Sequence, residues 1–332
     1  MAEFLLDVRG LSVEVTNRQG SFTIVEGIDF NLLKGEILGI VGESGCGKSL
    51  TALSIAGILQ KNVSVTGGDV LFEGNNLLKI KREDMRKIQG RDITMIFQEP
   101  MSSLNPLMKV GVQVAESLRL HSDMSNREIR SMTIKTLERV GLPNAEKIYS
   151  LYPHQLSGGM RQRVMIASAI ICKPKLIIAD EPTTALDAMI QAQILSLLRG
   201  INQEYGCSII FISHDLSVIR KFCTKVAVMY AGNFVEESDA EEIFGRPLHE
   251  YTRGLINAVP SNQSRGKRLF NISGKIPGMM EERKGCSYAA RCAKACEKCF
   301  TTKPQYLAFN EQHKVRCEFC MQEMEKTNGE NQ

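Results

Sequence analysis

A glycine-rich segment near the start of the chain has the composition of a phosphate-binding loop. It reads Gly42-Glu43-Ser44-Gly45-Cys46-Gly47-Lys48-Ser49 and fits the pattern G-x-x-x-x-G-K-[ST]. The glycines allow backbone N–H groups to converge on an anion, and a helix that begins here adds its positive end. Lys48 would reach the β- and γ-phosphates of a nucleotide, and the Ser49 hydroxyl would ligate Mg²⁺. The alternative interpretation is a glycine turn between a strand and a helix.

Two carboxylates follow an apolar run further along the chain. Leu176 to Ala179 predicts a buried strand, and Asp180 and Glu181 come directly after it. Ligands bind at the carboxyl ends of parallel strands, where these side chains would lie. We expect Asp180 to hold Mg²⁺ through water, and Glu181 to orient or deprotonate the attacking water. Alone, such a pair is more often a strand-end turn, but together with the phosphate loop it predicts nucleotide hydrolysis.

The elements that must position these residues follow from the apolar periodicity. Short continuous apolar runs and apolar–polar alternation predict strands, whereas a longer period predicts helices. The predicted strands are 5–15, 22–31, 36–41, 94–97, 176–179, 208–212 and 225–230, and the helical patterns are 49–58, 110–142, 151–171 and 190–198. Residues 66–98 predict strands and turns. We therefore expect an α/β fold with a mostly parallel sheet, helices on both faces and a helical subdomain inserted at about residues 99–172.

The overall composition is that of an ordinary soluble globular protein. The 332 residues include 41 Lys+Arg and 37 Asp+Glu, a net charge of +4, and 43% are hydrophobic. These values exclude a disordered chain, and the weak basicity gives no argument for nucleic acid as a partner. No apolar run has the length of a membrane span, and the N-terminal residues do not read as a signal peptide. We expect the chain to stay in the cytosol unless a partner holds it at a membrane.

Cysteines crowd near the C-terminus. Of the ten cysteines, six fall within residues 286–320, and in a cytosolic protein such crowding favours a metal over disulfides. Residues 261–268 are polar and basic without periodicity. We therefore predict a linker between a first domain at 1–260 and a small cysteine-rich extension at 261–332. The acidic run from Glu236 to Glu242 is expected to be a solvated face.

A motif ahead of the acidic pair carries a family resemblance. Leu156-Ser157-Gly158-Gly159-Met160-Arg161-Gln162 resembles the signature sequence of ABC-type ATPases. Gln98 resembles the glutamine of that family's Q-loop, Ala185-Leu186-Asp187 its D-loop, and His214 its switch histidine. The order and spacing agree over about residues 4–260. The resemblance implies the ABC-type P-loop NTPase fold, with a RecA-like core, an antiparallel β subdomain and an inserted helical subdomain.

The same resemblance implies a mechanism. Two such domains are expected to sandwich two ATP molecules, each between the phosphate loop of one domain and the signature motif of the other. ATP binding would close the sandwich and hydrolysis would open it, because the γ-phosphate is the contact that differs. The implied nucleotide residues are 42–49, Ser157, Gly158, Gly159 and Asp187, the implied Mg²⁺ residues are Ser49, Gln98 and Asp180, and the implied catalytic residues are Glu181, His214 and Gln98.

Longer strings narrow the resemblance to importers of dipeptides, oligopeptides and nickel. The similar strings are 97–106, 158–164, 180–187 and 249–252. Those importers use two different ATPase subunits, and Met160 with the pair Thr183-Thr184 resembles the first. The resemblance implies a heterodimer with a second homologous ATPase, two membrane permease subunits, an extracellular binding protein as an indirect partner and a place at the cytoplasmic face of the membrane. The cargo stays open between peptides and nickel or a nickel chelate. The alternative function is a soluble ABC ATPase acting on nucleic acid or ribosomes.

The same importers carry a C-terminal extension with the recurring pattern G-C-x-F-x-x-R-C, which residues 285–292 resemble. In some family members four such thiolates hold a [4Fe–4S] cluster, a role that here falls to Cys286, Cys292, Cys299 and Cys317. The set Cys296, Cys299, Cys317 and Cys320 also has the spacing of a four-thiolate Zn²⁺ site. The sequence leaves the cluster, zinc and free thiols open.

Overall fold

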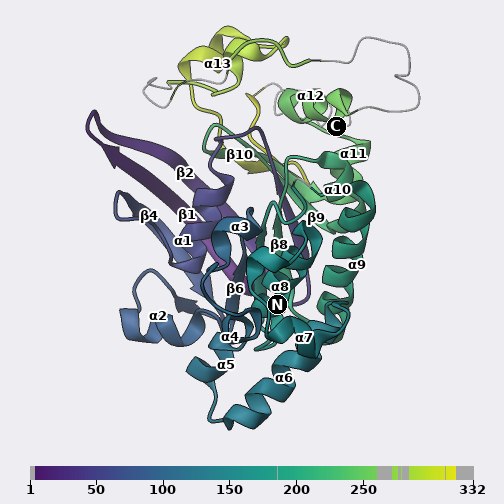
Figure 1. Ribbon diagram of the computed structural model, residues 1–332. Helices are drawn as coiled ribbons and strands as arrows, with labels where there is room; N and C mark the ends of the chain where they lie inside the picture. The colour runs from purple at the N-terminus through teal and green to yellow at the C-terminus, as the bar shows by residue number, and fades with distance from the viewer. Residues whose placement is uncertain are drawn as a thin grey trace.

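The centre of the molecule is a mixed β-sheet of eight strands (Figure 1). The computed structural model describes residues 4–184, 186–259, 271–275, 278, 284–310 and 312–318. The strands lie in the order β11-β12-β10-β9-β3-β8-β7-β6. Their bounds are β3 (Ile37–Val41), β6 (Ile93–Ile96), β7 (Leu176–Asp180), β8 (Ser208–Ile212), β9 (Lys225–Tyr230), β10 (Asn233–Asp239), β11 (Leu307–Ala308) and β12 (Lys314–Val315).

The strands from β6 to β9 in this order pair in parallel, in agreement with the predicted mostly parallel sheet. Successive side chains of β7 enter different cores. Leu176 and Ile178 pack into one hydrophobic cluster, whereas Ile177 and Ala179 pack into the other. Both faces of the sheet are therefore covered, which is why its strands lack apolar–polar alternation in the sequence.

A second, antiparallel sheet packs into one of these clusters. Its order is β2-β1-β4-β5. The bounds are β1 (Phe4–Asn17), β2 (Gly20–Leu33), β4 (Val63–Phe72) and β5 (Asn75–Asn76). β1 and β2 form the long hairpin at the left of Figure 1. Leu6 and Phe30 of this hairpin share a core with α1 (Lys48–Ala56), so this layer is the antiparallel β subdomain that the family resemblance implies.

The helices between β6 and β7 include α4, α5, α6 and α7, which lie at the lower end of the molecule in Figure 1. Their bounds are α3 (Pro100–Ser103), α4 (Val110–Val114), α5 (Glu116–His121), α6 (Asn126–Arg139), α7 (Ala145–Tyr149), the 3₁₀ helix η1 (Pro153–Gln155) and α8 (Gly158–Ile170). Packing among them is close, because a Cβ at Gly111 in α4 would lie 2.1 Å from the Tyr149 ring in α7. α6 begins with a capping box in which Ser125 and Glu128 each satisfy a backbone N–H of the other. These helices occupy the region predicted as the helical subdomain, and its limits stay a prediction.

The remaining helices flank the sheet or follow it. They are α2 (Arg82–Ile88), α9 (Ala188–Tyr205), α10 (Leu216–Phe222), α11 (Ala240–Gly245), α12 (Glu250–Ala258), the 3₁₀ helix η3 (Ala289–Arg291) and α13 (Glu297–Thr301). Across the described ranges, no helix combines the length and the apolar character needed to cross a membrane.

The prediction of only strands and turns for residues 66–98 is wrong, because α2 lies within them. The first turn of α2 carries Glu83 and Asp84 and its last turn carries Arg86 and Lys87, an order that favours the helix dipole. Met85 is the one residue of α2 that is buried. A helix with so small an apolar face leaves no periodic signal in the sequence.

The C-terminal residues reach back to the central sheet. β12 pairs antiparallel with β10 and with β11, so this part of the chain lengthens the sheet beyond β10. We call the described residues from 271 to 318 the C-terminal extension. Its helix α13 lies at the end of the molecule opposite the inserted helices (Figure 1). The predicted boundary at residue 260 lies outside the described residues and stays a prediction.

The acidic run from Glu236 to Glu242 was expected to be a solvated face, and for its first two glutamates this expectation is wrong. Glu236 is 0% exposed and Glu237 is 1% exposed. The Glu236 carboxylate accepts hydrogen bonds from the Leu248 and His249 N–H groups and lies 2.7 Å from His313 Nε2. Burial of these carboxylates is possible because residues far away in the sequence supply donors.

We predict that His313→Ala lowers the free energy of unfolding by about 2 kcal/mol, because it takes away one hydrogen-bond partner of the buried Glu236 carboxylate and leaves only the two backbone N–H donors. Urea unfolding of the full-length chain measures the effect. His154→Ala, at an exposed position, is the control and should stay within about 0.5 kcal/mol of the unaltered chain. Equal stabilities of the two variants would contradict the anchoring role of His313.

Candidate active site

The glycine loop lies between β3 and α1, where the sequence predicts it. Its path depends on glycine: a Cβ at Gly42 would lie 2.1 Å from the Met229 carbonyl oxygen, closer than atoms can approach. Gly45 and Gly47 have φ of 78° and 111°, in the left-handed region that other residues avoid. Gly47 is the N-cap of α1, so the loop ends where the helix N–H groups begin to point outward.

Lys48 lies inside the loop and not in solvent. The residue is 6% exposed. Its Nζ donates to the carbonyl oxygens of Gly42 at 2.8 Å and Glu43 at 3.0 Å. Cys46 is buried beside it, and burial raises the pKa of the Cys46 thiol, which keeps it protonated at neutral pH. The ammonium group is therefore held at the point where the loop backbone closes.

Asp180 is buried next to the loop at the end of β7. It is 6% exposed, and its Oδ1 has no hydrogen-bond partner among the described residues. Burial raises its pKa, and the charge of Glu181 adds to this, while a hydrogen bond from Ser49 and the charge of Lys48 oppose it. A buried carboxylate oxygen without a partner, beside a serine hydroxyl, fits the oxygen ligands that Mg²⁺ prefers.

Three residues that the sequence predicts as catalytic meet at one carboxylate oxygen. Glu181 Oε2 lies 3.1 Å from Gln98 Nε2 and 3.1 Å from His214 Nδ1. The three residues follow β6, β7 and β8, which are neighbours in the parallel sheet. Thr184, which the sequence marked only by resemblance and gave no role in the site, donates its hydroxyl to the same oxygen at 2.9 Å. Four polar groups therefore form one cluster at the carboxyl edge of the sheet.

The signature residues do not join this cluster. Ser157 caps α8 by accepting a hydrogen bond from the Met160 N–H at 3.3 Å. Within the described chain, neither a hydrogen bond nor an ion pair links Ser157, Gly158 or Gly159 to the glycine loop or to Glu181. Asp187 similarly caps α9, accepting from the Met189 and Ile190 N–H groups.

Gln162 is a link that the sequence interpretation missed. Its side chain is buried in α8, and its Nε2 donates to the Pro182 carbonyl oxygen at 2.6 Å. The bond ties the helix of the signature motif to the turn that carries Glu181. The sequence signal that could have predicted this contact is a glutamine on a helix face that is otherwise lined by apolar side chains.

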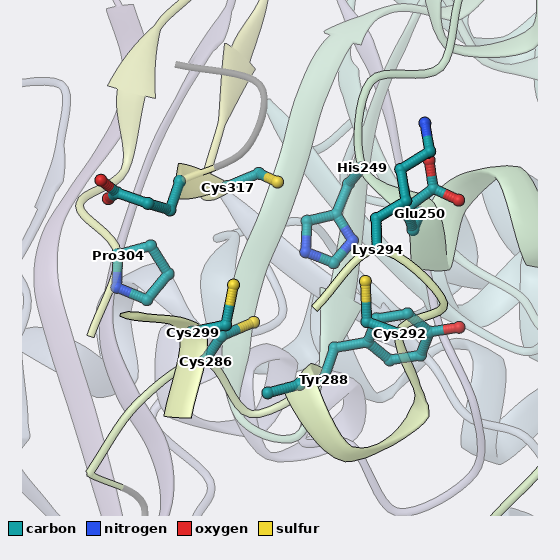
Figure 2. Close-up of a pocket in the computed structure, with 11 residues that line it drawn as sticks. His249, Glu250, Cys286, Tyr288, Cys292, Lys294, Cys299, Pro304 and Cys317 are labelled. Atoms are coloured by element: carbon teal, nitrogen blue, oxygen red, sulfur yellow. The ribbon is translucent and has the colours of Figure 1, made fainter. Parts of the chain in front are cut away.

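The cysteines are only partly brought together. Cys286, Cys292, Cys299 and Cys317 line one small cavity of ≈ 20 Å³ beside His249 and Glu250 (Figure 2). Burial raises the pKa of the Cys286 thiol to about 11. Cys296 is exposed, with its Sγ 3.5 Å from that of Cys299, and Cys320 lies outside the described residues. Among the residues that the structure describes, no three His, Cys, Asp or Glu side chains are arranged to hold a single metal ion.

The fold and this site define an ATP-hydrolysing cassette of the P-loop class, because the glycine loop and the acidic strand end meet at one edge of a parallel sheet. Residues 25–184 match the model of the ABC transporter family, and residues 235–299 match that of the oligopeptide/dipeptide transporter C-terminal region.

Relatives and solved structures agree with this class. The oligopeptide transport ATP-binding protein OppD of Escherichia coli is 46% identical over 91% of this chain and 90% of its own length. The oligopeptide transport ATP-binding protein AppD of Bacillus subtilis is 43% identical over 94% of this chain and 96% of its own length. The dimeric post-hydrolysis structure of the ATP-binding cassette MJ0796 with ADP and Pi is 27% identical, with a TM-score of 0.64 over 71% of this chain and 98% of that one. The chain belongs to the family of ABC transporter ATP-binding subunits that carry an oligopeptide/dipeptide transporter C-terminal region, and it is an ABC-type ATPase.

We predict that Asp180→Asn raises the free energy of unfolding at pH 7. Because the pKa of Asp180 is raised in the folded chain, its stabilising effect is present below the unfolded pKa and is lost as pH rises through the folded pKa. Removing the carboxylate should therefore relieve a penalty at neutral pH and change little at acidic pH. Thermal unfolding measured from acidic to neutral pH tests this effect. Asp123→Asn, at an exposed position, is the control. A less stable Asp180→Asn chain at pH 7 would contradict the burial argument.

Proposed function

We propose that the chain is the ATP-hydrolysing subunit of a membrane importer for peptides. The observation that carries the hydrolytic part is the convergence of Gln98 and His214 on the Glu181 carboxylate. The peptide part is supported by the names of the relatives, which include a dipeptide transport ATP-binding protein, DppD of Bacillus subtilis, 44% identical over 95% of this chain and 94% of its own length. These names favour peptides over nickel, and the C-terminal transporter match disfavours a soluble ATPase acting on nucleic acid or ribosomes.

The residues of the cluster would divide the chemistry between them. The glycine loop, from Gly42 to Ser49, would cradle the phosphates of ATP through its N–H groups and Lys48. Ser49, Asp180 and Gln98 would hold Mg²⁺, which neutralises phosphate charge when bound. Glu181 would take the proton of the attacking water, with its carboxylate oriented by Gln98 and Thr184. His214 would contact the γ-phosphate.

The second half of each site would come from another subunit. Ser157, Gly158 and Gly159 lie apart from the glycine loop, and a dimeric cassette is known for the related MJ0796. We propose that they reach the γ-phosphate held by a second, homologous ATPase subunit, with Asp187 at the same interface. The N-terminus of α8 supplies N–H groups and a positive dipole end for this contact.

Permease subunits would dock beside the inserted helices. A cavity of ≈ 490 Å³ next to Asp180 is lined by Phe97, Gln98 and Ser102, among others. Met101 and Leu107, in the segment that follows Gln98, are 66% and 85% exposed. Exposed apolar side chains around a hollow are typical of a protein-binding surface. We propose that each of two permeases places a short helix at such a groove, which would hold the subunit at the cytoplasmic face of the membrane and couple it indirectly to an extracellular binding protein.

The cysteine extension would form a small unit that follows an ABC domain ending near residue 260, and we propose that it carries a [4Fe–4S] cluster. All four thiols of one predicted set line the same cavity, whereas the zinc set includes Cys296, which is exposed, and Cys320, which lies outside the described residues. Four cysteine thiolates are the ligand set of a [4Fe–4S] cluster. Cys286, Cys292, Cys299 and Cys317 would supply its ligands, and its role would be structural.

We predict that Glu181→Gln lowers ATP turnover by roughly 10²–10⁴-fold without weakening ATP binding, because it removes the base and keeps the shape. The ATP-bound closed dimer should then accumulate and be seen by size-exclusion chromatography of the subunit with its ATPase partner. Glu204→Gln is the matched control, since Glu204 pairs with Arg139 away from the cluster. Unchanged turnover in Glu181→Gln would overturn the assignment of the base.

We predict that the chain purified without oxygen shows a broad visible absorption band, because iron–sulfur clusters absorb visible light and zinc thiolates do not. Cys286→Ser should abolish the band, while Cys296→Ser, at an exposed position, should keep it. Metal analysis then separates the outcomes. If the chain contains zinc without iron, and Cys296→Ser loses that zinc, the cluster is refuted and the zinc set is supported.

A further inference from the structure

Glu43, the second residue of the glycine loop, is held from two segments outside the loop. Its carboxylate forms a two-point ion pair with Arg291, with Nη1–Oε2 at 2.7 Å and Nη2–Oε1 at 3.0 Å. Its N–H donates to the Tyr251 hydroxyl at 2.9 Å. The pattern of the loop accepts any residue at this position, so the pattern does not explain these contacts.

Arg291 is fixed before it reaches the loop. Its side chain is 4% exposed and lies against the rings of Tyr230 and Tyr288, with the guanidinium carbon 5.7 Å and 5.9 Å from their centres. Nη1 also contacts the Tyr230 hydroxyl at 3.2 Å, and Nε donates to the Ser273 carbonyl at 2.9 Å. A buried guanidinium with these partners presents its remaining donors in one direction, toward Glu43.

The charge of Glu43 requires such a partner. The residue is part of a loop that, in the proposed function, receives the phosphates of ATP, and an ionised carboxylate there would repel them. The two-point pair neutralises this charge and fixes the orientation of the carboxylate. The same loop contains glycines that leave the backbone flexible, so fixing one of its residues also favours the binding-competent shape.

We propose that Arg291 is a positioning residue of the phosphate loop, which neutralises and orients Glu43 so that nucleotide binding depends on the C-terminal extension. The proposal rests on the proposed role of the glycine loop. It also gives a function to two strings that the sequence marked only by resemblance, 249–252 and 285–292, since Tyr251 and Arg291 come from them.

A purely structural anchor is the competing explanation, and the chain contains a matched control. Arg316 also ties the extension to the main body, since its Nε donates to the Phe234 carbonyl at 3.1 Å, while its Nη1 donates to the Pro304 carbonyl within the extension at 3.3 Å. Among the described residues, neither its hydrogen bonds nor its ring contact with Tyr306 involves the glycine loop. Replacing Arg316 therefore disturbs the anchoring of the extension without exposing the charge of Glu43.

The experiment measures Mg·ADP binding to the full-length chain by calorimetry, which avoids turnover. Arg291→Gln should weaken binding roughly 10-fold at low salt, and the loss should shrink at high salt because the repulsion is screened. Arg291→Lys should lie between this variant and the unaltered chain. Glu43→Gln should bind at least as tightly as the unaltered chain, and the double variant Arg291→Gln/Glu43→Gln should recover most of the loss. Arg316→Gln should stay within about twofold.

Three outcomes would decide against the proposal. Equal binding by Arg291→Gln and the unaltered chain, or an equal loss in Arg316→Gln, would leave Arg291 as an anchor only. A double variant that binds Mg·ADP as weakly as Arg291→Gln would refute charge neutralisation. If Arg291→Gln folds poorly, Glu43→Gln still tests the proposal, because weaker binding by Glu43→Gln than by the unaltered chain would contradict it. Lys48→Ala separates a failure of this proposal from a failure of the proposed function. If Lys48→Ala binds Mg·ADP normally, the phosphate loop itself is misassigned. If Lys48→Ala fails to bind while Arg291→Gln binds normally, only the role of Arg291 is overturned.

Discussion

Parallel pairing of β6, β7 and β8 is the constraint on which the rest of the site depends. The register sets Ile96 opposite Ala179 and Asp180 opposite Ile212, so the three strands end at the same level. The residues that follow these strands are Gln98, Glu181 and His214. They are far apart in the sequence, but the strand ends bring them together at one edge of the sheet. The contacts of Gln98 and His214 with Glu181 are the result of that register and not of any local motif.

The site is built at some cost to stability. Asp180 is buried with one oxygen lacking a partner, and Glu181 adopts a φ of 46° that non-glycine residues avoid. Its N–H is held by the Ile212 carbonyl at 3.0 Å, which fixes the turn. Two apolar cores that enclose the sheet on both faces supply the stability that offsets these local costs.

The C-terminal extension is joined to this machinery at two points. At the edge of the sheet, β12 pairs with β10, and His313 meets the buried Glu236. At the loop, Arg291 meets Glu43. The cysteines that line the cavity flank these contacts in the chain, since Cys286 and Cys292 lie on either side of Arg291 and Cys317 follows β12. Whatever fixes the four thiols therefore also fixes the segments that touch the sheet and the loop.

The sequence alone determined the α/β class, the glycine loop, the acidic strand end and the family, because each is written in consecutive residues whose chemistry or periodicity is local. It missed α2, whose polar surface carries no period, and it placed Glu236 and Glu237 in solvent, because their partners Leu248, His313 and Lys225 are distant in the chain. The meeting of Gln98, Glu181 and His214, and that of Glu43 with Arg291, 248 positions apart, could only be decided by the tertiary structure. Contacts of this kind depend on strand register and on the path of the chain between elements, which short-range residue patterns do not encode.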